Sequence, residues 1–227
     1  MGLLELADIE LVIGARQILH PMSLQFRAGE VTAVRGPSGS GKTTLLSVAG
    51  GLLQPTHGAT SYEGRPLWQG DGDPRPEVAF ILQVYGLVPI LSARENISVA
   101  LRARRVAPEE ADERADAELA RVHIGDLGDR QIEELSGGQM QRVACARAFA
   151  VDAVILLADE PTSELDEFNR ELVMSLLHEE AARGAIVVVA SHDPAVVDAS
   201  DRHVTLDEGR LTDHVQPVHA ARRGRVW

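Results

Sequence analysis

The sequence predicts an α/β protein built around a parallel sheet, and three observations lead to this prediction. A run rich in β-branched residues, 31–36, passes through a glycine-rich loop into a segment whose apolar residues have helical spacing. Two apolar runs that are closed by polar residues, 154–161 and 185–193, are typical of strands that are buried on both faces. Between these runs lies an amphipathic helical pattern over 169–184, and strands that alternate with helices indicate a parallel sheet.

Two further segments predict additions to this core. Residues 3–26 alternate apolar and polar side chains on both sides of a turn at Gly14, which is typical of paired strands. Residues 92–123 are rich in Ala, Arg and Glu and are predicted to be mostly helical, with Pro108 at the start of a helix. We therefore expect one domain that carries an inserted helical lobe.

The composition excludes several classes of protein. The chain has 227 residues and a net charge of −12, so no general attraction to the backbone of nucleic acid is expected. Its single cysteine, Cys145, excludes an intrachain disulfide and fits a reducing compartment. The first ten residues are acidic where a secretion signal would be basic, and no run of about 18 apolar residues is present. We expect a cytoplasmic protein that works at a membrane only if a partner holds it there.

The segment GPSGSGKTT fits the pattern G-x-x-x-x-G-K-[ST] between a predicted strand and a predicted helix. Its glycines let backbone amides curl around an anion, and the following helix adds the positive end of its dipole. The pattern predicts a loop that holds the phosphates of ATP, with Mg²⁺ coordinated by the hydroxyl of Thr43. The nine residues of the loop are Gly36, Pro37, Ser38, Gly39, Ser40, Gly41, Lys42, Thr43 and Thr44.

Lys42 is the only lysine among the 22 basic residues of the chain. In this loop the charge must pass along a narrow passage to the β- and γ-phosphate oxygens. An ammonium on a flexible stem can do so, whereas the planar fork of a guanidinium is too wide. The retained lysine therefore supports a phosphate-binding role for the loop.

The apolar run VILLADEP ends in two adjacent carboxylates. Asp159, at the carboxyl end of the predicted buried strand, is expected to hold Mg²⁺ through water. Glu160 follows directly and is placed to polarise the attacking water as a general base. Either acid alone could be a solvated strand end, but beside a phosphate-binding loop the catalytic interpretation is favoured.

Residues 135–149, LSGGQMQRVACARAF, resemble the ATP-binding subunits of ABC transporters, in which LSGGQ is the signature sequence. The resemblance implies that two subunits pair head to tail and that each signature covers the ATP held by the other subunit. A serine and flexible glycines at a helix start suit a second anion-binding site. The residues that the resemblance assigns to this second half-site are Ser136, Gly137, Gly138 and Gln139.

The same resemblance implies the fold. It is a P-loop NTPase of the ABC ATPase type, with a mixed-sheet core, an antiparallel β subdomain and an inserted helical subdomain. We expect one such domain over 1–227, with the helical subdomain at about 86–150 and a tail at 213–227.

Other family positions follow in order along the chain. Gln83 matches the glutamine that joins Mg²⁺ and the attacking water to the transmembrane partner. Residues 161–166, PTSELD, match the D-loop at the dimer seam, and His192 matches the switch histidine that contacts the γ-phosphate. The resemblance therefore assigns catalytic roles to Gln83, Glu160 and His192, and assigns Gln83 to the metal as well.

The sequence departs from the family pattern at two positions. Ile13 aligns with an aromatic residue that usually stacks on adenine, so we expect it to contact the base with weaker adenine affinity or a relaxed base preference. Glu164 adds a negative charge to the D-loop, where a small or amide residue is commoner.

Residues 82–101 are similar to the small subunits of lipoprotein-release, macrolide-export and cell-division ABC complexes. This similarity implies a homodimer at the cytoplasmic face of the membrane, bound to an integral membrane permease and taking part in export. Two alternatives stay open at this point. One is an ATPase that transmits force to an extracytoplasmic process without transport, and the other is a soluble ABC ATPase with no membrane partner.

Overall fold

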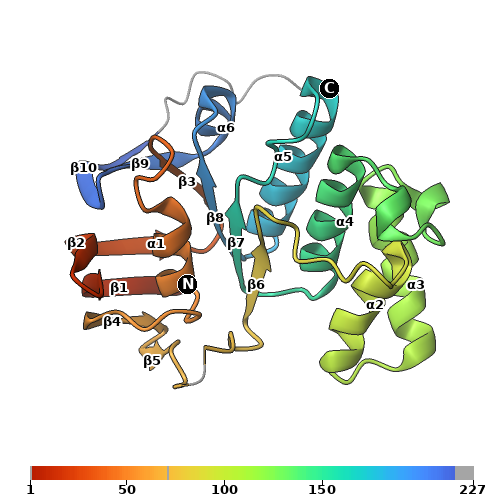
Figure 1. Cartoon of the computed structure of the whole chain (residues 1–227), viewed down its shortest axis with the longest axis horizontal. Coiled ribbons are helices and arrows are strands. Elements are labelled where there is room, and N and C mark those ends of the chain that lie inside the picture. The colour runs from red at the N-terminus through yellow and green to blue at the C-terminus, as the bar shows by residue number, and fades with distance from the viewer. Residues whose placement is uncertain (1, 71, 218–227) are drawn as a thin grey trace.

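The computed structural model describes residues 2–70 and 72–217, and its centre is a six-stranded sheet (Figure 1). The strand order is β10-β9-β3-β8-β7-β6, and every neighbouring pair is parallel except β10 with β9. The strands are β3 (Val31–Arg35), β6 (Val78–Ile81), β7 (Ile155–Asp159), β8 (Ile186–Ser191), β9 (Arg202–Asp207) and β10 (Arg210–Pro217). The predicted parallel core is confirmed.

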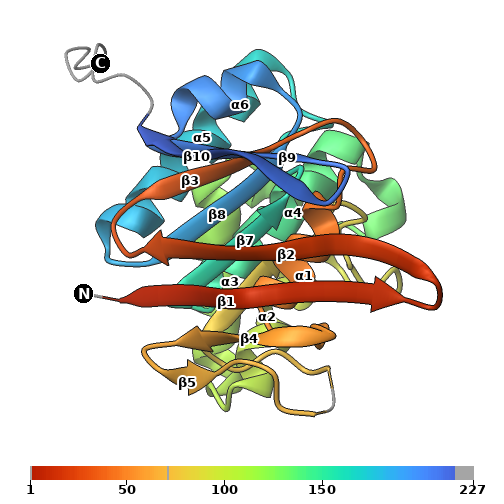
Figure 2. The same ribbon diagram turned by 90° about the vertical axis from the view of Figure 1, so that its left-hand side faces the viewer.

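A second, antiparallel sheet of order β2-β1-β4-β5 covers one side of this core. Its strands are β1 (Leu3–Ile13), β2 (Arg16–Arg27), β4 (His57–Tyr62) and β5 (Arg65–Pro66). The two longest strands run side by side across the near face in Figure 2. Helix α1 (Lys42–Ala49) lies between the two sheets.

Side chains that alternate along the central strands divide the interior into two cores. In β8, Val188 and Ala190 pack with α1 and the antiparallel sheet. Val187 and Val189 point to the opposite face and pack with the helices there. Neither face of such a strand contacts solvent, and its sequence is therefore apolar without interruption.

The other helices lie beyond the second face of the central sheet (Figure 1). They are α2 (Ala93–Ala103), α3 (Pro108–Arg121), α4 (Gly137–Ala150), α5 (Glu167–Ala182) and α6 (Pro194–Ala199). Three of them, α2 to α4, occur between β6 and β7 and form a lobe at one end of the molecule. The fold class is that predicted from the resemblance, with a mixed sheet, an antiparallel β subdomain and a helical subdomain.

The C-terminal region differs from the sequence-based expectation. Strand β10 continues to Pro217, so the first five residues of the expected tail, 213–217, belong to a strand. Its neighbour β9 has the period of two that a strand requires, because Val204 and Leu206 are buried while Asp207 is exposed. Residues 218–227 of the expected tail lie outside the described residues.

Within the described residues, no helix is both long enough and apolar enough to span a lipid bilayer.

Cys145 is fully buried in α4, and its sulfur lies 4.0 Å from the carbonyl oxygen of Pro161. Burial raises the pKa of the thiol to about 12. At pH 8 only about one thiol in ten thousand is then ionised, and the thiolate is the reactive form. We expect a disulfide reagent to modify no thiol in the native protein and one in the denatured protein. Rapid modification of the native chain would show that this helix opens readily.

Candidate active site

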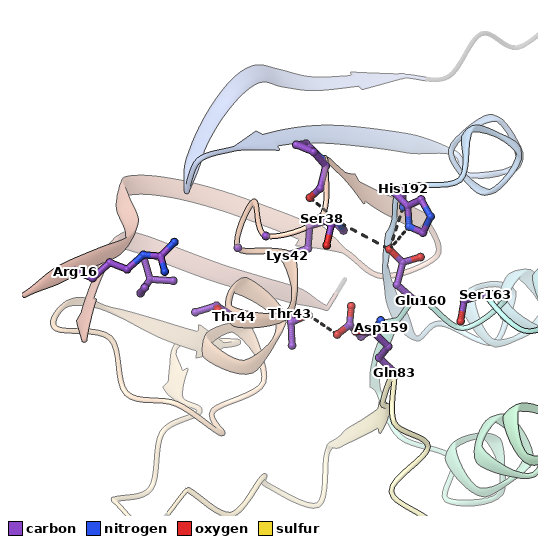
Figure 3. A pocket seen from close by; sticks show the side chains of 14 residues that line it. Arg16, Ser38, Lys42, Thr43, Thr44, Gln83, Asp159, Glu160, Ser163 and His192 are labelled. Atoms are coloured by element: carbon purple, nitrogen blue, oxygen red, sulfur yellow. Dashed lines mark hydrogen bonds and ion pairs between the residues drawn. The ribbon is translucent and has the colours of Figure 1, made fainter. Parts of the chain in front are cut away.

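A cavity of about 540 Å³ opens at the carboxyl ends of the parallel strands (Figure 3). Strands β3, β7 and β8 all end at this edge, which is where open α/β sheets bind ligands. The residues that line the cavity are Arg16, Ile18, Pro37, Ser38, Gly39, Gly41, Lys42, Thr43, Thr44, Gln83, Asp159, Glu160, Ser163 and His192.

The loop between β3 and α1 requires glycine at two positions. A Cβ atom at Gly36 would lie 2.1 Å from the carbonyl oxygen of Leu206, so no larger residue fits. Gly41 has a φ of +102° and forms the N-cap of α1. Gly41 lines the cavity and places no side chain before the start of α1, which suits an anion site at a helix N-terminus.

Lys42 begins α1 and has a relative exposure of only 7%. Its ammonium donates to the carbonyl oxygens of Gly36 at 2.9 Å and Pro37 at 3.2 Å, and its Nζ lies 3.8 Å from Oε1 of Glu160. The ammonium is thus held between the loop and the carboxylate of Glu160. An anion that enters the cavity meets this positive charge.

Thr43 and Asp159 meet although 116 positions separate them in the sequence. The hydroxyl of Thr43 donates to Oδ2 of Asp159 at 2.6 Å. Burial raises the pKa of Asp159, and the adjacent Glu160 raises it further, while Thr43 and Lys42 oppose the change. A hydroxyl beside a buried carboxylate is a donor set that suits Mg²⁺, which prefers oxygen ligands.

Glu160 lies at the centre of a hydrogen-bond network. The hydroxyl of Ser191 donates to its Oε2 at 2.9 Å, and the backbone amide of His192 donates to its Oε1 at 3.1 Å. Nδ1 of His192 lies 2.7 Å from the same Oε1. The backbone of Glu160 has a φ of +47°, a strained value for a residue with a side chain. The fold holds this carboxylate in one place at some cost.

The structure brings most of the predicted site residues together. Seven residues of the phosphate loop line the cavity, and so do Gln83, Asp159, Glu160 and His192. Gly36 and Ser40 shape the loop without lining this cavity, and Ser40 lines a neighbouring one. Ile13 does not line it and is 55% exposed.

The four signature residues form the N-terminus of α4 and do not line the cavity of their own chain. Ser136 is exposed, and its hydroxyl accepts from the amide of Gln139 at 3.3 Å, while Oε1 of Gln139 accepts from the amide of Ser136 at 2.8 Å. A Cβ at Gly138 would lie 2.9 Å from the carbonyl oxygen of Glu164, so the D-loop packs directly on this glycine. The chain thus keeps the signature residues apart from its own phosphate loop.

Sequence reasoning missed three residues that line the cavity, Arg16, Ile18 and Ser163. Ser163 stands inside the PTSELD segment, which was assigned to the dimer seam. Arg16 and Ile18 lie at the start of β2. The alternation of apolar and polar residues in a strand does not indicate whether its first residues face a ligand. Their position depends on how the antiparallel sheet packs beside the phosphate loop.

The fold and the cavity define a P-loop nucleotide-binding protein. The family model described as "ABC transporter" matches residues 19–163. An uncharacterized ABC transporter ATP-binding protein of Mycobacterium tuberculosis is 40% identical over 193 residues, which is 83% of this chain and 58% of that protein. The macrolide export ATP-binding/permease protein MacB 1 of Yersinia pestis bv. Antiqua is 37% identical over 199 residues, covering 86% and 31% of the two chains.

A solved structure agrees with these sequence relatives. The ATP-binding cassette MJ0796, a dimer in a post-hydrolysis state bound to ADP and Pi, is similar with a TM-score of 0.84 and 29% identity. The match covers 95% of this chain and 99% of that chain. The chain belongs to the ABC transporter family and is one of its ATPase domains. It spans 58% of the length of the first curated relatives that it matches.

The raised pKa of Asp159 predicts that the charged form, which Mg²⁺ binding requires, lowers the stability of the folded protein. A carboxyl group whose pKa is raised by folding favours the folded state only while it is protonated, so its charged form is destabilising at neutral pH. We expect Asp159→Asn to raise the melting temperature of the nucleotide-free protein at pH 8 by about 2–4 °C. This increase in melting temperature should become smaller as the pH falls through the pKa of Asp159, because the wild-type carboxyl group is then protonated.

The control for this prediction is Asp207→Asn, which changes an exposed aspartate at the end of β9. Its melting temperature should stay close to that of the wild type in scanning calorimetry. A lower melting temperature for Asp159→Asn at pH 8 would contradict the predicted cost of the buried charge.

Proposed function

We propose that this chain binds and hydrolyses Mg²⁺-ATP in a head-to-tail homodimer and drives a separate membrane permease, as part of an exporter. The observation that carries the proposal is the separation of two half-sites. The phosphate loop, Asp159 and Glu160 surround one cavity, while the exposed N-terminus of α4 lies outside it. A second copy of the chain offers the missing half, with its signature placed over the nucleotide.

Each residue of the cavity has a chemical task in this proposal. The loop amides and Lys42 bind the β- and γ-phosphates and stabilise the charge that develops on them. Thr43 and Asp159, with Gln83, would hold Mg²⁺, which neutralises phosphate charge when bound. Glu160 accepts the proton of the attacking water on its carboxylate. His192, Ser191 and the backbone amide of His192 keep that carboxylate oriented.

Opening and closing of the dimer is the proposed mechanical output. ATP that contacts both half-sites favours the closed dimer, and hydrolysis removes the contact that holds it closed. The MJ0796 cassette is dimeric with ADP and Pi bound, which supports the same assembly here.

An exposed apolar surface beside Gln83 supports a permease partner. Among the described residues, Val84, Val88, Ile90 and Val99 are exposed by 41% to 83%. They follow Gln83 directly in the chain or lie on α2, the first helix of the helical lobe. Exposed apolar side chains on neighbouring segments of the chain are a feature of interaction sites. The loop that reaches the cavity through Gln83 would thus also reach the partner.

Similarity to a macrolide export protein supports the export branch. The acidic net charge of −12 supports a protein partner rather than nucleic acid as the binding partner.

The first test of this function is the substitution Glu160→Gln. Loss of the general base should lower ATP hydrolysis by about 10²- to 10⁴-fold while nucleotide binding persists. The variant should therefore accumulate as an ATP-bound dimer, measured by light scattering on a sizing column. Adding Ser136→Arg to the same chain should leave ATP binding intact but return it to a monomer, because the second half-site is blocked.

Three results would contradict this proposal. Turnover close to that of the wild type in Glu160→Gln would remove Glu160 from catalysis. A monomer with ATP bound would remove the two-copy site. Normal ATP affinity in Lys42→Ala would show that the nucleotide does not use the phosphate loop.

The second test concerns the membrane partner. Affinity capture from native membranes in mild detergent should recover an integral membrane protein in stoichiometric amount, and Ile90→Asp should release it because a charge enters the apolar contact. ATP binding by the isolated variant should stay normal. The control is Val154→Asp, which changes an exposed apolar residue just before β7, at the end of that strand away from Asp159. Recovery of the same partner with both variants, or of no membrane protein with the wild type, would overturn the permease proposal.

A further inference from the structure

Arg16 stands at the open end of the nucleotide cavity. It is the first residue of β2 and pairs across the hairpin with Ile13, the last residue of β1. Its side chain lies on the opposite side of the phosphate loop from Glu160 and His192 (Figure 3). Arg16 also lines a second cavity of about 580 Å³, which contains His20 and the turn between β9 and β10. Arg16 is thus one of the residues that border both cavities.

The guanidinium of Arg16 has no hydrogen-bond or ion-pair partner anywhere in 2–70 or 72–217. Many arginines elsewhere in the fold are paired, for example Arg102 with Asp112 and Arg121 with Glu118. Other arginines that lack a side-chain partner within the described residues, such as Arg27 and Arg65, are exposed and do not line this cavity. A planar cation that lies against a cavity without a protein partner is free to contact a ligand there. Its neighbour in the lining is Ile18, which packs against the core and presents an apolar surface.

The rest of the cavity leaves one direction for the nucleoside. The triphosphate end is assigned to the loop, with Asp159, Glu160 and His192 around its terminal phosphate. The ribose and base must then extend toward the other end, where Arg16 and Ile18 stand. A base presents a π face that is apolar and electron-rich, and a guanidinium stacks on such a face. Ile13, the residue expected from the sequence to contact the base, does not line the cavity.

We propose that Arg16 is the residue that packs on the nucleotide base, with its guanidinium plane against the ring and Ile18 beneath it. This inference rests on the proposed function, because it assumes that the cavity holds ATP. A guanidinium face stacks on a ring without reading its hydrogen-bonding edge. The site should therefore bind ATP and GTP with similar affinity.

The test compares two ligands that differ by the nucleoside. Titration calorimetry measures binding of Mg²⁺-ATP and of Mg²⁺-tripolyphosphate, which has the phosphates without a base. Arg16→Ala should weaken ATP binding by about 3- to 30-fold and leave tripolyphosphate binding unchanged. Arg16→Tyr, which stacks without charge, should restore ATP binding to within about threefold of wild type. Arg27→Ala is the matched control, since it removes an exposed arginine at the far end of β2.

Each other outcome has a distinct meaning. Equal loss of both ligands in Arg16→Ala would mean that the guanidinium acts on phosphate charge, and it would overturn stacking. Loss of ATP binding in Ile13→Ala but not in Arg16→Ala would return the base to Ile13. Unchanged ATP binding in Arg16→Ala with normal binding by the wild type would overturn this inference alone. No ATP binding by the wild type would overturn the proposed function itself.

Discussion

The parallel pairing of β3, β7 and β8 is the constraint on which the rest of the structure depends. In this register Asp159 lies opposite Ala190, and Arg35 lies opposite Ser191. Three neighbouring strands that run in one direction end at one edge, so the residues that follow each strand share a single space. The phosphate loop, the two acids and the histidine meet there although they are far apart in the chain. No local sequence pattern specifies the contacts between them. The sheet is what makes Lys42 and Glu160 neighbours.

That meeting concentrates charge in a poorly solvated place. Lys42, Asp159 and Glu160 are each less than 8% exposed, and the desolvation of ions opposes folding. Hydrogen bonds from Thr43 and Ser191 offset part of this cost, and the ammonium of Lys42 offsets a further part. The remaining desolvation cost is visible in the raised pKa of Asp159, and the positive φ of Glu160 adds a separate backbone strain. Such an arrangement suits a site whose missing charges arrive with a phosphate ligand and a cation.

The helical lobe is joined to the cavity by contacts as well as by the chain. Arg147 of α4 donates to the backbone carbonyls of Tyr85 and Gly86, in the loop that follows Gln83. Glu164 lies beside Gly137 at the start of α4, and its charge raises the pKa of Tyr85 further than burial alone. The loop after β6, the signature helix and the D-loop therefore contact one another within one chain.

The sequence by itself determined the phosphate loop, the two acids, the helical lobe and the family, because each depends on local patterns. A glycine loop needs its glycines wherever it stands, and a strand buried on both faces must be apolar throughout. Only the tertiary structure decided that β9 and β10 complete the sheet and that Arg16 rather than Ile13 lines the cavity. These features depend on how the sheets and the helical lobe pack. The spacing of apolar residues within a segment does not specify which distant segment it packs against.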